Sequence, residues 1–245
     1  MLVFSHPQPC HQPTHPKLNS AWGFDALRAF LDFILKALKK FGYVAQWKIL
    51  NTMDFGAPQQ RARWYLVAIR EDCVRQRVAA DWFPRPLPCL SLARIVKPLP
   101  DHRWMPAPAK EDANAHANVM AAYKALKEKG INAFSKPVII DTGCSARFRI
   151  YRVSASPCIT HTRGSQLAYW CSTKGGRLTV SELGRLQGFG PSDIDWKGAG
   201  LTAHQYGGML GNAQSLCVVE ALLPYVLYAS KIIDTDDFQL LMAQC

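Results

Sequence analysis

The sequence predicts an α/β fold, in which a helix and two strands are separated from a closing apolar helix by a basic, irregular stretch. Three observations carry this prediction. Residues 24–41 have the spacing of an amphipathic helix. Residues 43–50 and 64–69 are apolar runs of strand length. Residues 216–228 are apolar on most sides, which indicates a buried helix.

The composition of the 245-residue chain favours an acidic partner. Lys and Arg number 29 against 18 Asp and Glu, for a formal net charge of +11. Such a balance suits nucleic acid, although a protein that is merely basic stays open as the alternative. The eight cysteines form no Cys-x-x-Cys pair, so we expect no metal site and an intracellular protein with reduced thiols, nuclear in a eukaryotic host. No run approaches a membrane span and no leader pattern is present, so we expect no membrane partner.

The first elements are predicted in the order helix, strand, turn, strand. The helix begins at Phe24 and stops at Gly42, and a polar loop joins the two strands. That loop is too short for a parallel crossover, which predicts antiparallel neighbours. Residues 1–23 hold many Pro and His with little periodicity, and we expect them to form a disordered or displaced arm.

Residues 70–115 combine basic side chains with many prolines and with aromatic residues, including Trp82, Phe83 and Trp104. One interpretation is a small irregular domain whose charge meets a phosphate backbone. The alternative is a proline-rich loop whose aromatic side chains anchor it to the core. We favour the first for the charge and the second for the tryptophans.

The later elements are predicted from spacing and from capping signals. A helix over 118–129 is followed by strands over 137–141 and 148–153. Thr179 and Glu182 have the spacing of a capping box, so a helix is expected to start there and to end at Gly188. Gly211-Asn212 precedes the closing helix, where it predicts either a ligand contact or simple capping.

A polar row precedes the second strand. Gln59, Arg61 and Arg63 alternate along an extended segment, so their side chains are expected to point the same way. Two guanidiniums there suit a phosphate, a carboxylate or an oxygen that gains charge during a reaction. The alternative is a basic strand edge whose arginines pair with local carboxylates, and the residues alone leave both open.

Three segments together resemble the last three conserved blocks of the cytosine-C5 DNA methyltransferases. They are Asp-Phe-Gly-Ala-Pro-Gln-Gln-Arg-Ala-Arg at 54–63, Arg-Leu-Thr-Val-Ser-Glu-Leu-Gly-Arg-Leu-Gln-Gly-Phe at 177–189, and Gly-Asn-Ala at 211–213. The resemblance implies the C-terminal part of a Rossmann-like S-adenosylmethionine-dependent methyltransferase sheet plus a small irregular α+β recognition domain. Residues 24–70 and 205–232 would form the partial catalytic domain, and residues 71–204 the DNA-recognition domain.

The resemblance also implies a chemistry. The family flips a cytosine out of double-stranded DNA and transfers a methyl group from S-adenosylmethionine to its C5 atom. By position in the first block, Arg63 would face the base, and Arg61 and Gln59 would help to build its pocket. Asn212 and Ala213 would help to close the cofactor site.

Three earlier blocks of the family have no counterpart here. We find no Phe-x-Gly-x-Gly cofactor loop, no Glu-Asn-Val and no Pro-Pro-Cys-Gln, of which Pro9-Cys10-His11-Gln12 is only an echo. We therefore expect a C-terminal fragment that is inactive alone. It would be either the product of a truncated gene or one half of a split enzyme that a complementing N-terminal methyltransferase half completes. The alternatives are a non-catalytic DNA-binding module of the same descent and an RNA-directed relative that acts on tRNA. Gln214-Ser215, where the family has Val-Pro, and Gly190-Pro191, where it has Pro-Asp, depart from the blocks.

Overall fold

The computed structural model describes residues 2–7, 21–75, 82–96, 107–145, 148 and 150–244. The chain divides into two compact units, each discontinuous in sequence. Unit 1 comprises Met1–Leu50, Ala62–Arg85 and Glu220–Cys245, and unit 2 comprises Asn51–Arg61 and Pro86–Val219. Residues 51–61 and 205–219 belong to unit 2. The assignment of residues 24–70 and 205–232 to a catalytic part and of residues 71–204 to a DNA-recognition part stays a prediction. Cys10, Trp104 and part of the basic stretch lie outside the described residues.

Unit 1 begins with strand β1 (Leu2–Pro7), helix α1 (Ala21–Lys40) and strand β2 (Tyr43–Asn51). The predicted helix is confirmed, with its start three residues earlier than expected. Gly42 joins α1 to β2 with φ of +74°, a conformation that glycine adopts without strain, so the predicted stop is confirmed as well.

Strand β3 (Ala62–Arg70) is the middle strand of a three-stranded sheet of order β1-β3-β2. It is therefore the neighbour of β2, as predicted. Most of its residues are buried, with Leu66, Val67 and Ala68 at 0% exposure. The pairing of β1 with β3 is antiparallel, with Phe4 opposite Leu66. Strand β1 lies within residues 1–23, which we had expected to form a disordered or displaced arm. It was missed because six residues are too few to show a period.

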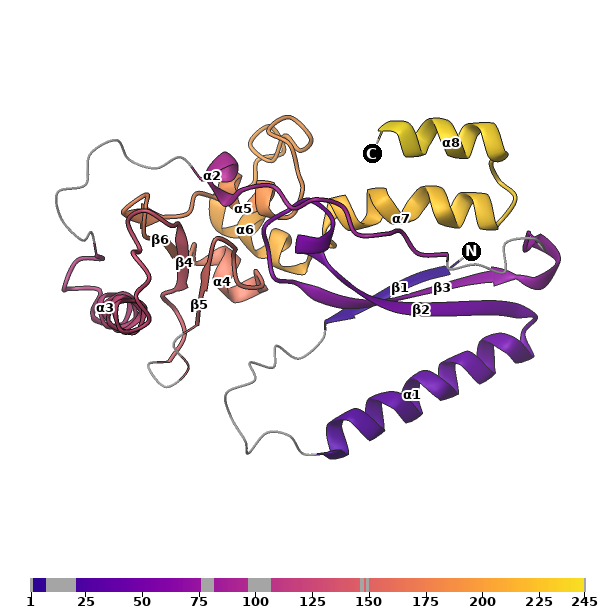
Figure 1. Cartoon of the computed structure of the whole chain (residues 1–245), viewed down its shortest axis with the longest axis horizontal. Helices are drawn as coiled ribbons and strands as arrows, with labels where there is room; N and C mark the ends of the chain where they lie inside the picture. The colour runs from indigo at the N-terminus through magenta and orange to yellow at the C-terminus, as the bar shows by residue number, and fades with distance from the viewer. Residues whose placement is uncertain are drawn as a thin grey trace. The chain divides into compact units, whose positions relative to one another are not determined.

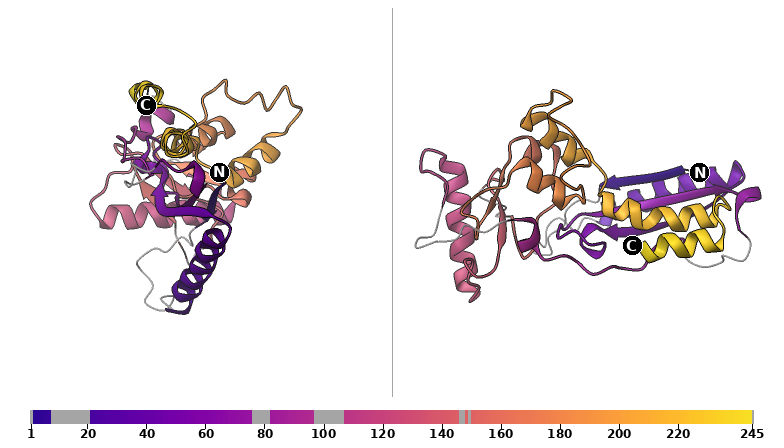
Figure 2. Two further views of the ribbon diagram at one scale, coloured as in Figure 1. Left: turned by 90° about the vertical axis from the view of Figure 1, so that its right-hand side faces the viewer. Right: turned by 90° about the horizontal axis from the view of Figure 1, so that it is seen from above.

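Helix α7 (Leu216–Ala229), from Glu220 onward, and helix α8 (Thr235–Gln244) complete unit 1. Figures 1 and 2 show the sheet between α1 on one side and these two helices on the other. Arg75 binds the end of α7: its guanidinium donates to the carbonyls of Tyr228 (3.1 Å) and Ile233 (2.9 Å). The guanidinium also lies 4.3 Å from the centre of the Tyr228 ring. A cation at a helix C-terminus is favourable for the helix dipole.

Unit 2 is built on a four-stranded antiparallel sheet of order β5-β4-β6-β7. Its strands are β4 (Val138–Asp141), β5 (Tyr151–Val153), β6 (Tyr169–Cys171) and β7 (Gly176–Arg177). Its helices are α2 (Leu92–Ile95), α3 (Ala113–Glu128), α4 (His161–Ser165), α5 (Val180–Leu186) and α6 (Ala203–Asn212). Short 3-10 turns lie at Thr52–Asp54 in unit 2 and Glu71–Cys73 in unit 1.

Both faces of β4 are covered, because alternate side chains of a strand point to opposite faces. Val138 and Ile140 pack in a core cluster with α3, which includes Tyr123 and Leu126. Ile139 points the other way, into a second cluster that α5 and α6 contribute to. The sheet of unit 2 is thus the middle layer between α3 and the α5–α6 pair.

Helix α6 was not predicted. No element was predicted for residues 203–212, in which Gly207, Gly208 and Gly211 are poor helix formers. The structure explains these glycines by close packing. A Cβ atom on Gly207 would collide with the carbonyl oxygen of Gly164 in α4, and one on Gly211 would collide with the backbone at Thr160 and His161. Only glycine therefore lets α4 and α6 approach so closely.

Among the residues that the structure describes, no single helix has both the length and the apolar composition to cross a membrane. Helices α6 and α7 meet that criterion only when they are taken together across a bend.

Candidate functional site

The candidate residues of the polar row are buried. Gln59 is 0% exposed, Arg61 4% and Arg63 8%. Gln59 and Arg61 belong to unit 2, and Arg63 is the second residue of β3 in unit 1. Buried polar side chains need hydrogen-bond partners, so the hydrogen bonds of each residue indicate its structural role.

Arg61 binds two distant segments of unit 2. Its Nη1 atom donates to the carbonyl of Ile159 at 2.6 Å and lies 3.4 Å from the sulfur of Cys158. Its Nη2 atom donates to the carbonyls of Gly211 at 3.2 Å and Ala213 at 2.7 Å. A planar guanidinium fits such a task, because its donors form a rigid fork. Arg61 therefore fastens the end of α6 to the segment before α4.

Gln59 makes the same kind of connection to α5. Its side-chain nitrogen donates to the carbonyl of Leu186 at 2.8 Å, and its side-chain oxygen accepts from the N–H of Ile159 at 3.4 Å. The backbone here is paired with Ser156 through an isolated parallel bridge at Gln59. Residues 59–61 thus pair with the segment 156–159 through both backbone and side-chain hydrogen bonds.

A second buried network joins the end of α5 to the start of α7. The hydroxyl of Ser215 donates to the side-chain oxygen of Gln187 at 3.1 Å and lies 2.5 Å from the hydroxyl of Thr52. Gln187 in turn donates from its side-chain nitrogen to the carbonyl of Leu210 at 2.7 Å. Ser215, where the sequence departs from the related blocks, therefore has a defined structural role.

Tyr169 supports the segment beside Arg61. Its hydroxyl donates to the carbonyl of Cys158 at 2.9 Å. Burial raises the pKa of Tyr169 far above its ordinary value of 10.0, and the nearby Asp141 carboxylate adds to this effect. Tyr169 consequently remains a neutral hydrogen-bond donor at any ordinary pH.

The other predicted site residues are placed differently. The Nη1 atom of Arg63 donates to the carbonyl of its neighbour Ala62 at 2.7 Å. Asn212 is the last residue of α6 and is exposed, while Ala213 caps that helix by donating its N–H to Met209. The roles of Arg63 as a base contact and of Asn212 and Ala213 as cofactor contacts stay predictions.

Sequence reasoning missed the roles of several residues in this cluster. Ile159, Gln187 and Ser215 contribute through buried carbonyl, amide and hydroxyl groups. Gln187 lies within the second block, and its 0% exposure is the signal that a buried polar residue has a specific partner. The capping box of Thr179 and Glu182 is confirmed, which supports the structural role we had assigned to them.

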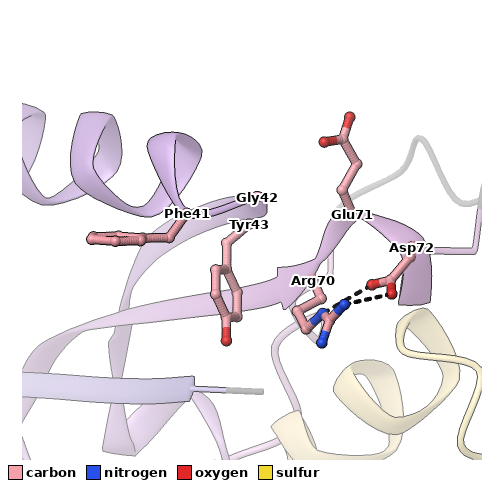
Figure 3. Close-up of a pocket in the computed structure, with 6 residues that line it drawn as sticks. All are labelled: Phe41, Gly42, Tyr43, Arg70, Glu71 and Asp72. Carbon is pink, nitrogen blue, oxygen red and sulfur yellow. Dashed lines mark hydrogen bonds and ion pairs between the residues drawn. The ribbon is translucent and has the colours of Figure 1, made fainter.

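The structure also has a shallow hollow in unit 1, shown in Figure 3. Phe41, Gly42, Tyr43, Arg70, Glu71 and Asp72 line it, and its volume is about 580 Å³. Arg70 and Asp72 form an exposed ion pair across 2.8 Å within it. None of the predicted site residues lies in this hollow. Among the described residues, no group of three or more His, Cys, Asp or Glu is placed to hold a metal ion.

The mixed α/β fold and the meeting of the three sequence blocks around Gln59 and Arg61 define a protein of the cytosine-C5 methyltransferase type. The family model for C-5 cytosine-specific DNA methylases matches residues 25–226, and the chain belongs to this family. The α/β fold class predicted from the sequence is confirmed with it.

Curated relatives are type II methyltransferases. The chain is 27% identical over 213 residues to M.NgoBI of Neisseria gonorrhoeae, which covers 80% of this chain and 55% of the relative. It is 27% identical over 218 residues to M.SsoII of Shigella sonnei, covering 88% of this chain and 51% of the relative. The chain therefore spans about half the length of these relatives.

Among solved structures, the chain is similar to the Entamoeba histolytica methyltransferase EhMeth, with a TM-score of 0.48 and 16% identity over 83% of this chain and 59% of that one. It is also similar to the S. pombe Dnmt2 methyltransferase, with a TM-score of 0.45 and 17% identity over 80% and 62% of the two chains.

Proposed function

We propose that this chain supplies the target-recognition part and a share of the base pocket of a DNA (cytosine-5)-methyltransferase. The complete enzyme would transfer a methyl group from S-adenosylmethionine to C5 of a cytosine in double-stranded DNA. A complementing methyltransferase half would provide the nucleophile and the cofactor loop, so that the chain alone would be inactive.

The observation that carries this proposal is the arrangement around Arg61. Three segments that match the family's blocks are far apart in sequence, and hydrogen bonds of Gln59 and Arg61 join all three. Buried polar groups cost free energy unless they are paired, and the side chains of Gln59 and Arg61 are paired with groups of the other two blocks. The three blocks therefore form one connected unit, as a base pocket built from them requires.

Charge on unit 2 supports nucleic acid as the partner. Exposed lysines lie on α3 and on the segments that flank it, at Lys110, Lys124, Lys127, Lys129 and Lys136. Lysines of this kind contact phosphates and release counterions, so binding should weaken steeply with salt. Two less exposed cations of unit 2 form ion pairs, Arg163 with Asp141 at 3.0 Å and Lys174 with Glu182 at 2.6 Å.

Arg63 is the residue that we assign to the reacting base. During addition at C6 of the cytosine, electron density moves toward O2 and N3. A guanidinium near O2 stabilises that density in the manner of an oxyanion hole and stays charged at any working pH. In this role Arg61 and Gln59 position the loop that precedes Arg63 and do not touch the base.

The proposal is tested by measuring binding and methyl transfer separately. Fluorescence anisotropy with a cytosine-containing DNA duplex and with tRNA, at several salt concentrations, reports the partner. Transfer of labelled methyl from S-adenosylmethionine is then measured for the chain alone and with the part of M.NgoBI that the match leaves uncovered. We expect preference for duplex DNA, no transfer alone and transfer in the mixture, with Arg63→Lys reducing transfer by at least tenfold and Arg70→Ala leaving it unchanged.

Other results would redirect the assignment. Preference for tRNA would favour an RNA-directed relative, and DNA binding without transfer in the mixture would favour a non-catalytic DNA-binding module. Transfer by the purified chain without a partner would refute the idea that it is incomplete.

A further inference from the structure

Helix α1 has an apolar side that the described residues leave uncovered. None of its residues from 28 to 40 is buried. Phe30 is 54% exposed and Phe33 is 69% exposed, and Phe41, just beyond the helix, is 75% exposed. Residues three apart lie on the same side of a helix. The apolar residues on its other side, Leu31, Ile34, Leu35 and Leu38, are half-buried. Because a helix gains most of its stability by packing, the side with Phe30 and Phe33 is the one that the described residues leave without a packing partner.

Strand β2, which follows α1, is exposed in the same way. Leu50 is its one buried residue, whereas β3 beside it is buried along most of its length. Trp47 is 45% exposed and Ile49 is 46% exposed. These two side chains are two residues apart and therefore lie on one face of the strand. Single exposed apolar residues are ordinary, but several on consecutive elements mark an interaction surface. We call Phe30, Phe33, Trp47 and Ile49 the α1–β2 surface.

The α1–β2 surface also has an open strand edge and exposed basic side chains. Because β2 is an end strand in the order β1-β3-β2, its outer edge can accept a further strand. Among the described side chains of α1 and β2, the exposed basic residues outnumber the one exposed acidic residue, Asp32: Arg28, Lys36, Lys39, Lys40 and Lys48. A second copy of the chain would bring like charges together, which costs several kcal/mol when such pairs are juxtaposed. The surface therefore fits a partner that is apolar at its centre and acidic at its rim.

We propose that the α1–β2 surface docks the part of the methyltransferase domain that the relatives have beyond the matched region. The match covers 55% of M.NgoBI and 51% of M.SsoII, so close to half of each relative remains to supply such a partner. This inference rests on the proposed function and names the surface through which the two halves meet. The partner covers the aromatic side chains of α1 and Trp47, and its rim carboxylates face the lysines.

The test uses the full chain and, as probes, the uncovered parts of M.NgoBI and M.SsoII, each expressed with it. Association is measured by co-purification and then by analytical ultracentrifugation at several salt concentrations. Phe33→Glu and Trp47→Glu place a charge in the surface, and Ile232→Glu and Leu240→Glu are matched controls at residues that are each 62% exposed elsewhere in unit 1. We expect a one-to-one complex that Phe33→Glu and Trp47→Glu weaken at least tenfold and that the controls leave intact.

Three results would overturn the docking surface. They are failure of both probes to bind, binding that Phe33→Glu and Trp47→Glu do not affect, and self-association of the chain through these residues. Circular dichroism of each variant confirms that it is folded before binding is compared. A complex that forms through this surface but transfers no methyl group would leave the docking intact and reject the proposed function, so that the two are distinguished.

Discussion

The guanidinium of Arg61 donates a hydrogen bond to the main-chain carbonyl of Ala213, 2.7 Å away in space and 152 residues away in sequence. Arg61 also binds the carbonyls of Ile159 and Gly211. Arg61 therefore connects backbone segments that are far apart in sequence. An arginine that we had grouped with its neighbour Arg63 on the basis of spacing has its own separate role.

Replacing Arg61 should destabilise unit 2. Arg61→Ala leaves the buried carbonyls of Ile159, Gly211 and Ala213 without these donors, and we expect a loss of about 3 kcal/mol in the free energy of unfolding. Arg61→Lys should lose less, because the ammonium can still donate to some of these carbonyls, although it cannot reproduce the fork. Urea unfolding followed by circular dichroism measures both. Arg70→Ala is the control, since the exposed Arg70–Asp72 pair should contribute less than about 1 kcal/mol. Equal losses for the Ala variants at 61 and 70 would contradict the assigned role.

Adding one methyl group to Gly207 should also destabilise the protein. Alanine is a better helix former than glycine by about 1 kcal/mol, so propensity alone predicts a gain for Gly207→Ala in α6. The Cβ atom would instead collide with the carbonyl of Gly164, and we expect a net loss of roughly 1–3 kcal/mol. Gly176→Ala is the control, because its nearest neighbouring atom would be 4.0 Å away. A higher melting temperature for Gly207→Ala would show that α4 and α6 are not in close contact.

The capping box of α5 offers a narrower test. Thr179 accepts a hydrogen bond from the N–H of Glu182 at 3.2 Å, and the Glu182 carboxylate accepts from the N–H of Thr179 at 2.7 Å. Thr179→Ala should cost about 1 kcal/mol, whereas Thr179→Ser should retain nearly all of the stability. Thermal unfolding of the three proteins at one pH compares them. Similar losses for both variants would mean that the methyl group, not the hydroxyl, is what matters.

Stability should fall at alkaline pH. Burial raises the pKa of the Cys171 thiol above its ordinary value of 9.0, and burial raises the pKa of Tyr169 above 10.0. The unfolded chain therefore releases these protons at lower pH than the folded protein does. Their contribution is complete below about pH 9 and decreases as the pH rises further, because the unfolded state then binds fewer protons. Urea midpoints at several pH values from 8 to 11 measure the slope. Cys171→Ala should flatten it, and an unchanged slope in that variant would reject the assignment.

The elements that could be predicted from the sequence are those with a local signal. The period of α1, the stop at Gly42 and the Thr179–Glu182 box are each set by neighbouring residues, and the structure has all three. Strand β1 and helix α6 were missed. In α6 the tertiary contact with α4 selects glycine, and that requirement overrides the poor helix propensity of glycine.

The candidate site was predicted only in part, for a related reason. The residue types at 59 and 61 indicated a polar function, but alternation along an extended chain could not show that both side chains are used within unit 2. Arg63 in β3 and Asn212 in α6 stay predictions as base and cofactor contacts. The acceptors of Arg61 are main-chain carbonyls, which leave no trace in an amino-acid sequence.

Residues 51–61 are made early and their partners late, since unit 2 extends to Val219. On the ribosome, the first acceptor of Arg61 to be made is Ile159, and the last, Ala213, follows only after 152 residues beyond Arg61 have been added. The burial of this loop can therefore be completed only near the end of synthesis, after the antiparallel sheet of unit 2 has had time to form. We expect this closure to be the slow step of folding, since contacts between distant residues are the slowest to form.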